Sequence, residues 1–177
     1  QGDEVLHEDY LAPIKAAMEA HRTNSEVDGL LFDYRHFYGS YDYIGQATRW
    51  YRKEIRVVRV RDDIFSYRDA QGFRMGDNEK LKVKPVDAHI HHYGWVKDPR
   101  AQQRKQENFH KMWHNDEWLE KNVAKAEAFD YGVVDALQKF QGTHPKVMQE
   151  RIDRINWTFD FDISRNKLSF KDKLKKG

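Results

Sequence analysis

The segment from Gly29 to Tyr38 constrains the fold of this chain more than any other part of the sequence. It reads Gly-Leu-Leu-Phe-Asp-Tyr-Arg-His-Phe-Tyr, apolar at first and alternating later, and it ends at Gly39-Ser40. This pattern is typical of a strand that leaves a hydrophobic core. Two further strands are predicted at residues 54–60 and 81–93, and Pro85 indicates a bulge or a sheet edge within the latter.

Helical patterns flank these strands. From Asp9 to His21 apolar residues recur every three or four positions, which predicts an amphipathic helix with Asp9 as its N-cap. Beyond Pro99 helix formers dominate, and we expect helices at 100–113, 116–129, 133–140 and, starting at Thr143-His144-Pro145, up to Arg154, followed by a weakly amphipathic basic tail at 165–176. The pattern predicts an α/β fold with a mixed sheet and flanking helices in residues 1–98, and a helical extension in residues 99–177.

Composition excludes several classes of protein. The 177 residues are enough for one domain with a real core, and 14% aromatic residues argue against disorder although 34% of the residues are charged. A formal net charge of +2 gives no strong positive electrostatic potential of the kind that attracts nucleic acid. The absence of Cys excludes disulfides and thiolate metal sites and fits a reducing, cytosolic setting. No run approaches the roughly 20 apolar residues that span a bilayer.

An acidic pair, Asp3-Glu4, stands within the opening segment Gln1-Gly2-Asp3-Glu4-Val5-Leu6-His7-Glu8. If Val5 and Leu6 mark the end of a core strand, the two carboxylates can coordinate a hard divalent ion such as Mg²⁺ or Mn²⁺. Alternatively they cap the following helix or face solvent.

Histidines form a second cluster, His89-x-His91-His92. On a strand His89 and His91 share one face and His92 takes the other, so two of them at most reach one metal ion. His110 and His114 lie one turn apart on a predicted helix, which keeps a His-based metal hydrolase as one hypothesis. Ordinary buried or exposed histidines are the alternative.

Two further segments carry polar chemistry. Asp69 lies between Arg68 and Arg74 and is either a general base or an ion-paired loop residue. Flat aromatic side chains with polar tips suit sugar rings, and they are concentrated in the segment that contains His36, Phe37, Tyr38, Tyr41, Tyr43, Trp50 and Tyr51. Core packing is the alternative for about half of these.

Taken in order, several segments resemble the C-terminal half of bacterial family 2 glycosyltransferases. These segments are residues 1–8, Gly29-Leu30-Leu31-Phe32, His36-Phe37-Tyr38-Gly39-Ser40, residues 50–56, residues 68–74, His92-Tyr93-Gly94-Trp95-Val96 and Gly142-Thr143-His144-Pro145. The resemblance covers most of the chain. It implies the acceptor side of a GT-A fold, beginning at the acidic metal motif, with the nucleotide-binding half outside this chain.

The resemblance also implies an activity: inverting transfer of a sugar from a nucleotide-sugar donor to a glycan or lipid-linked acceptor, as in polysaccharide biosynthesis. Asp69 takes the place of the catalytic base. A divalent cation, Mn²⁺ or Mg²⁺, is expected at Asp3, Glu4 and His92, although Gln1 stands where the Asp-x-Asp pattern has its first carboxylate. The donor phosphates are assigned to Arg52, Arg56 and Arg68, and the acceptor to His36, Tyr38, Tyr41, Trp50 and Trp95.

A cytoplasmic location follows from these expectations, at the inner face of the membrane if the acceptor is lipid-linked, with peripheral membrane contact. A sheet truncated at its start would expose an apolar surface and favour a homodimer. The alternative function is a non-catalytic interaction or acceptor-binding module that lacks the nucleotide-binding half.

Overall fold

The computed structural model describes residues 2–47, 49–68, 72–111, 118 and 126–167. The chain forms two compact units. The first unit contains residues 1–35, 49–92 and 143–147, and the second contains residues 36–48, 93–142 and 148–177.

The first unit is built on a mixed sheet with the strand order β1-β7-β2-β4. Its strands are β1 (Glu4–Leu6), β2 (Gly29–Tyr38), β4 (Lys53–Val58) and β7 (Val83–Trp95), and the last residues of β2 and β7 belong to the second unit. β1 is antiparallel to β7, and β4 is antiparallel to β2. β2 and β7 run in the same direction, because Asp28 N donates to Lys82 O before both strands and Gly39 N donates to Trp95 O at their ends.

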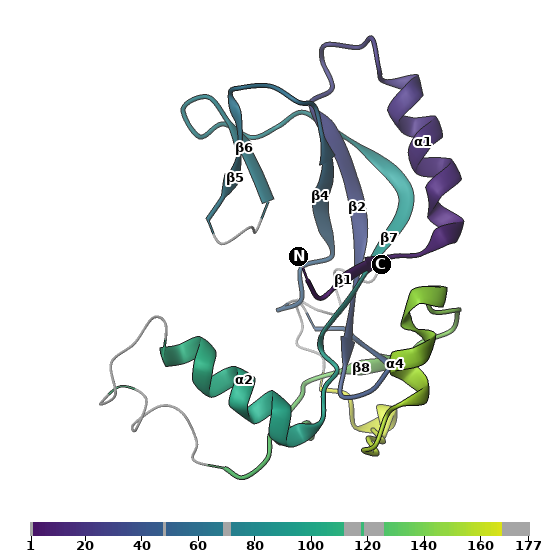
Figure 1. Ribbon diagram of the computed structural model, residues 1–177, viewed down its shortest axis with the longest axis vertical. Coiled ribbons are helices and arrows are strands. Elements are labelled where there is room, and N and C mark those ends of the chain that lie inside the picture. The colour runs from purple at the N-terminus through teal and green to yellow at the C-terminus, as the bar shows by residue number, and fades with distance from the viewer. Residues whose placement is uncertain (1, 48, 69–71, 112–117, 119–125, 168–177) are drawn as a thin grey trace. The chain divides into compact units, whose positions relative to one another are not determined.

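Helix α1 (Leu11–Ala20) follows the short 3₁₀ helix η1 (Glu8–Tyr10) and lies beside this sheet (Figure 1). Its one buried residue, Ile14, belongs to a core cluster with alternate residues of the two central strands. These are Leu30, Phe32 and Tyr34 of β2 and Val86, Ala88 and Ile90 of β7. Since side chains alternate along a strand, the even-numbered residues of both strands form one buried face.

A separate hairpin, β5 (Ile64–Tyr67) and β6 (Gly72–Met75), lies next to β4 in the same unit (Figure 1). Its strands are antiparallel, with Tyr67 opposite Gly72. β6 contacts β4, and residues 69–71 between the two hairpin strands lie outside the described residues.

The second unit contains β3 (Tyr43–Gly45), which pairs with the end of β2 and with β8 (Leu137–Lys139). Its helices are α2 (Pro99–Lys111), α4 (Gln149–Asp153) and η3 (Ile163–Arg165), and η2 (Lys146–Met148) begins in the first unit and ends here. Its interior is aromatic: Phe37 stacks on Tyr93 with ring centroids 4.7 Å apart, and Phe140 meets Phe37 edge to face at 5.0 Å. Such pairs contribute beyond their apolar burial.

The predicted α/β class with a mixed sheet is confirmed, and strand 29–38 and helix 9–21 lie where the sequence predicts them. Two predictions about local structure are wrong. Residues 137–139 form a strand rather than a helix, because Leu137 is fully buried and the segment pairs with β3. Asp9 is not an N-cap: its backbone N–H donates to His7 Nδ1. Of the predicted helix at 116–129 most residues lie outside the described ones, and 126–129 are not helical.

Within the described ranges, the search for a helix long and apolar enough to cross a bilayer finds none. The predicted domain boundary between residues 98 and 99 stays a prediction.

Candidate functional site

Polar side chains from four segments meet on the buried face of the first unit's sheet. β1 and β7 pair with Glu4 directly opposite His92, so both side chains lie on the face that carries Leu6 and Ile90. Tyr34 of β2 lies on the same face, with its ring 5.7 Å from that of His92. We refer to Asp3, Glu4, Tyr34, Tyr51, Glu54, Arg56 and His92 as the sheet-face cluster.

Arg56 lies on the same face as Glu54, two positions earlier on β4, and a bulge follows at this point of the strand. Leu30 pairs with Val57 and Leu31 with Ile55, so Arg56 has no partner residue on β2. Its guanidinium donates to both carboxylate oxygens of Glu4, Nε at 2.6 Å and Nη2 at 2.8 Å. Burial opposes ionisation of Glu4, but the hydrogen bonds from Arg56 and Tyr34 hold its pKa below the ordinary 4.5. Glu4 is therefore a carboxylate fixed by a bidentate pair.

Glu54 is the second carboxylate beside Arg56, and it is bound less tightly. It lies opposite Phe32, on the core face, with Oε2 3.6 Å from Arg56 Nη1. Burial raises the pKa of Glu54 above 4.5, and Arg56 offsets this only in part. A Cβ placed on Gly72 of β6 would lie 3.5 Å from Glu54 Oε2, so the hairpin approaches this carboxylate.

Two tyrosines complete the cluster. The backbone of Arg52 accepts a hydrogen bond from Tyr34 N at 2.8 Å, which fixes the loop before β4 beside β2. The rings of Tyr34 and Tyr51 consequently lie 4.8 Å apart. Burial raises the pKa of the Tyr34 hydroxyl, and hydrogen bonds to Tyr51 and Glu4 act in the same direction. Tyr34 is buried, whereas Tyr51 is 44% exposed and lies at the solvent side of the cluster.

Asp3 and His92 are the pair best suited to a divalent cation. Asp3 Oδ2 lies 3.5 Å from His92 Nε2, and Asp3 is partly exposed. Both oxygens of Glu4 are bonded to Arg56, which makes Glu4 a less suitable ligand. Among the described residues there is no group of three or more His, Asp or Glu side chains that could hold a metal ion. Mg²⁺ usually takes oxygen ligands, one or two carboxylates together with water and substrate phosphates, and of this pair only Asp3 could supply one.

The opposite face of the sheet holds other histidines. His91 is fully buried, 3.3 Å from Arg35 Nη1, and burial together with Arg35 lowers its pKa to about 3. The rings of His7 and His144 lie 6.1 and 6.4 Å from that of His91. Because His7 Nδ1 accepts from Asp9 N, its Nε2 carries the proton and donates to Thr143 Oγ1 at 3.0 Å. In this tautomer His7 holds the segment at Thr143 in place by a hydrogen bond. It cannot act as a base towards the Thr143 hydroxyl, because its Nε2 already carries a proton.

The remaining predicted site residues are dispersed. Asp69 lies outside the described residues. Arg68 has a positive φ of 52° and lies over the ring of Tyr67 at 5.0 Å, and Arg49 lies over the ring of Trp50 at 5.3 Å. The predicted acceptor residues of the second unit are His36, Tyr38, Tyr41 and Trp95, of which the first three are buried and Trp95 is partly buried.

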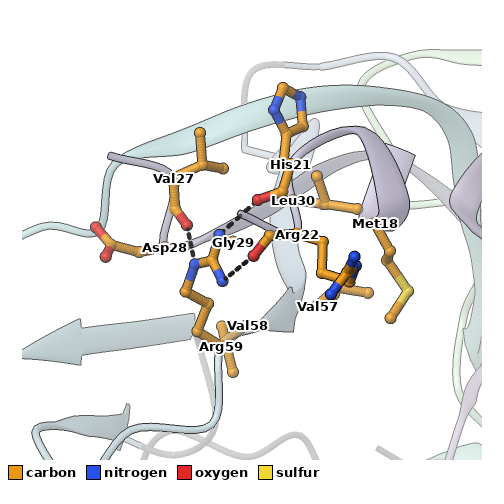
Figure 2. A pocket seen from close by; sticks show the side chains of 10 residues that line it. All are labelled: Met18, His21, Arg22, Val27, Asp28, Gly29, Leu30, Val57, Val58 and Arg59. Atoms are coloured by element: carbon orange, nitrogen blue, oxygen red, sulfur yellow. Dashed lines mark hydrogen bonds between the residues drawn. The ribbon is translucent and has the colours of Figure 1, made fainter. Parts of the chain in front are cut away.

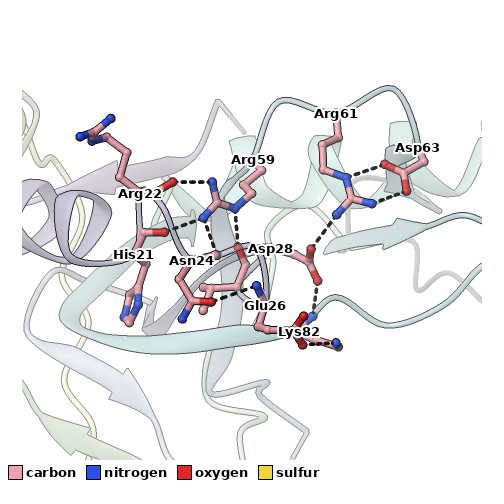
Figure 3. Close-up of polar contacts among 10 residues, drawn as sticks. His21, Arg22, Asn24, Glu26, Asp28, Arg59, Arg61, Asp63 and Lys82 are labelled. Carbon is pink, nitrogen blue, oxygen red and sulfur yellow. Dashed lines mark hydrogen bonds and ion pairs between the residues drawn. The ribbon is translucent and has the colours of Figure 1, made fainter.

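A hollow of about 190 Å³ lies elsewhere in the first unit, between the end of α1 and the adjoining ends of β2 and β4 (Figure 2). Arg59 at its edge donates to four backbone carbonyls, those of His21, Arg22, Asn24 and Val27 (Figure 3). Arg61 beside it bridges Asp28 and Asp63, and Asp28 also accepts from Lys82 N. These hydrogen bonds hold the loop between α1 and β2 in place, so Arg59 and Arg61 have structural roles.

Sequence reasoning missed Tyr34 and Glu54 as site residues, and it named Tyr51 only within the aromatic segment suited to sugar rings. The spacing of Glu54 and Arg56, two positions apart on a strand, was a usable signal because both side chains would then share a face. Nothing in the sequence alone indicated that the buried ring of Tyr34 packs against the more exposed ring of Tyr51.

No protein-family model, curated protein or solved structure matches this chain.

Proposed function

We propose that the chain is the acceptor-side portion of a GT-A glycosyltransferase that moves a sugar from a nucleotide-sugar donor to a glycan or lipid-linked acceptor with inversion. One observation carries this proposal: four residues selected from the sequence as site residues meet beside one sheet face, namely Glu4 of β1, Arg56 of β4, His92 of β7 and Asp3 just before β1. Residues so far apart in the sequence meet there without being needed for an apolar core.

The chemistry requires a carboxylate that removes the proton of an acceptor hydroxyl. The oxygen then forms a bond to the anomeric carbon while the bond to the diphosphate breaks. Asp69 is the proposed base, as the resemblance implies, and it lies outside the described residues. Asp3 and His92 would hold a Mg²⁺ or Mn²⁺ ion, which supplies charge stabilisation to the departing diphosphate.

The test is release of nucleoside diphosphate by the natural full-length polypeptide from a panel of nucleotide sugars, with Mn²⁺ present. We expect Asp69→Asn to lower kcat by about 100-fold or more, as for loss of a general base. Asp3→Ala should raise the Mn²⁺ concentration needed for half-maximal rate. Asp77→Asn, at an exposed aspartate of the first unit, is the matched control. Near-full transfer by both site variants would reject the assignment.

A non-catalytic acceptor-binding module is the second candidate, and the bidentate bond between Glu4 and Arg56 favours it because it satisfies both groups without any ligand. Calorimetry with Mn²⁺ and uridine diphosphate separates the two candidates. Saturable binding to this chain would contradict the module, whereas absence of binding together with binding of a glycan would support it.

A further inference from the structure

We propose that Tyr67, Arg68 and Arg74 form a binding site for a diphosphate group, in which one aromatic ring positions two guanidinium groups that bind the phosphate oxygens. The resemblance assigned Arg68 to donor phosphate, whereas Tyr67 and Arg74 had no assigned role. That the diphosphate belongs to a nucleotide sugar rests on the proposed function, but the site itself does not.

The hairpin of β5 and β6 brings these three residues together. Tyr67 pairs with Gly72 and Phe65 pairs with Arg74, so Tyr67 and Arg74 are diagonal neighbours on one face of the hairpin. Arg68 follows Tyr67 directly, at the end of β5. The guanidinium carbon of Arg74 lies 4.6 Å from the centre of the Tyr67 ring, and that of Arg68 lies 5.0 Å from it. Both distances are those of a cation–π contact.

The shared ring limits the separation of the two positive charges. Because both distances end at one ring centre, the two guanidinium carbons are at most about 10 Å apart. The phosphorus atoms of a diphosphate are roughly 3 Å apart, and a phosphate bound by an arginine fork has its phosphorus roughly 4 Å from the guanidinium carbon. One diphosphate therefore reaches both arginines over this whole range, whereas a single phosphate reaches both only if they are closer.

The contact with the ring leaves the N–H donors of both arginines available. A guanidinium over a ring is held by its face, whereas its N–H donors lie in its plane. Among the residues that the structure describes, the guanidinium groups of Arg68 and Arg74 form no hydrogen bond or ion pair. Arg56, Arg59 and Arg61 of the same unit instead donate to acceptors of the protein. Arg68 is exposed and Arg74 is partly exposed, so an anion reaches both from solvent.

Two guanidinium groups held beside one ring repel each other, and a bound anion removes that repulsion. Because the ring already positions both side chains, binding costs little side-chain entropy. A carboxylate of the sheet also approaches the hairpin, since a Cβ on Gly72 would lie 3.5 Å from Glu54 Oε2. Arg56 Nη1 lies 3.6 Å from that oxygen, so Glu54 adds little net negative charge beside the two arginines.

The test is isothermal titration calorimetry of the 177-residue chain with inorganic pyrophosphate, in EDTA and at constant ionic strength. We expect saturable binding to the wild type. Arg68→Gln and Arg74→Gln should each weaken it by about tenfold, as expected for loss of a charged hydrogen-bond donor. Tyr67→Leu, which removes the ring that positions both arginines, should weaken it as well, whereas Tyr67→Phe should bind nearly as the wild type does.

Arg104→Gln is the matched control, because it removes the same charge from an exposed arginine of the second unit. Circular dichroism checks that each variant folds. The proposal is overturned if pyrophosphate does not bind the wild type, or if Arg68→Gln and Arg74→Gln weaken binding no more than Arg104→Gln does. Binding of vesicles that contain phosphatidic acid, without binding of pyrophosphate, would also overturn it, because the ligand would then be a membrane surface.

This outcome is separable from that of the proposed function. Pyrophosphate binding that depends on Arg68 and Arg74, without any diphosphate release by the full-length polypeptide, would uphold the site and reject the transferase. Transfer with an unchanged KM for the nucleotide sugar in Arg74→Gln would do the reverse.

Discussion

Replacing Arg56 by Met removes the guanidinium that pairs with Glu4 and Glu54, two of the three carboxylates of the sheet-face cluster. Arg56 and Glu4 side chains are 17% and 7% exposed, so the variant leaves a buried carboxylate without its charged partner. Breaking such a pair costs about 3–5 kcal/mol. We expect about 3 kcal/mol, the lower end of this range, which for a chain of this size lowers Tm by roughly 6–12 °C.

The loss should depend on pH in a defined direction. The folded-state pKa of Glu4 is lowered below 4.5, so its ionisation stabilises the fold above that pH, and this stabilisation is lost as the pH falls through the folded-state pKa. Without Arg56 the pKa of Glu4 rises, and so does that of Glu54, which Arg56 now holds down in part. The deficit of the variant is therefore greatest at about pH 7, and it shrinks as the pH falls through the raised pKa of Glu4 in the variant towards the lowered pKa of Glu4 in the wild type.

Urea unfolding followed by tryptophan fluorescence at several pH values measures this deficit. Glu4→Gln and the double variant complete a double-mutant cycle, and a coupling free energy of about 2 kcal/mol is expected for groups in direct contact. Arg22→Met removes an exposed arginine of the same unit and serves as the control. A cost below about 1 kcal/mol, or a cost that stays constant between pH 4 and pH 7, would refute the reasoning.

Two other substitutions test the packing of the first unit. In Gly29→Ala the new Cβ would lie 2.5 Å from the backbone oxygen of Val57, so we expect a loss of about 1–3 kcal/mol in urea unfolding, whereas Gly2→Ala, with nothing within 4 Å, should be neutral. Equal stability of the two variants would contradict the close approach of β2 and β4. Arg59→Met removes donors to four backbone carbonyls at the end of α1, so unfolding should become easier by roughly 2 kcal/mol and amide exchange in the last turn of α1 should accelerate. Unchanged exchange there would show that these bonds do not hold the helix end.

The sequence predicts long, regular elements well and short pairings poorly. β2 and α1 are visible because periodicity over ten residues reports which face is buried. β8 has three residues and is defined by its pairing with β3, more than 90 positions earlier, and no local pattern carries that information. A helix was expected there because the segment contains good helix formers, and tertiary pairing overrides that preference.

For the candidate site the sequence supplies residue types but not their neighbours. The prediction that His91 and His92 face opposite sides follows from strand geometry and agrees with the register, in which they oppose Val5 and Glu4. That Arg56 pairs with Glu4 depends on the antiparallel pairing of β4 with β2 and of β1 with β7. Both are long-range features, so an arginine expected to bind phosphate was found bonded to a carboxylate.

If the sugar is transferred at the sheet-face cluster, as we propose, the nucleoside diphosphate and the metal ion should bind there. Chemical-shift mapping of the ¹⁵N-labelled chain with millimolar uridine diphosphate and Mg²⁺ measures where they bind. We expect the perturbed amides to include Asp3, Glu4, Tyr34 and His92, and those around the hollow at His21 and Arg59 to stay unchanged. Perturbations confined to that hollow, or none at any residue of the cluster, would contradict it.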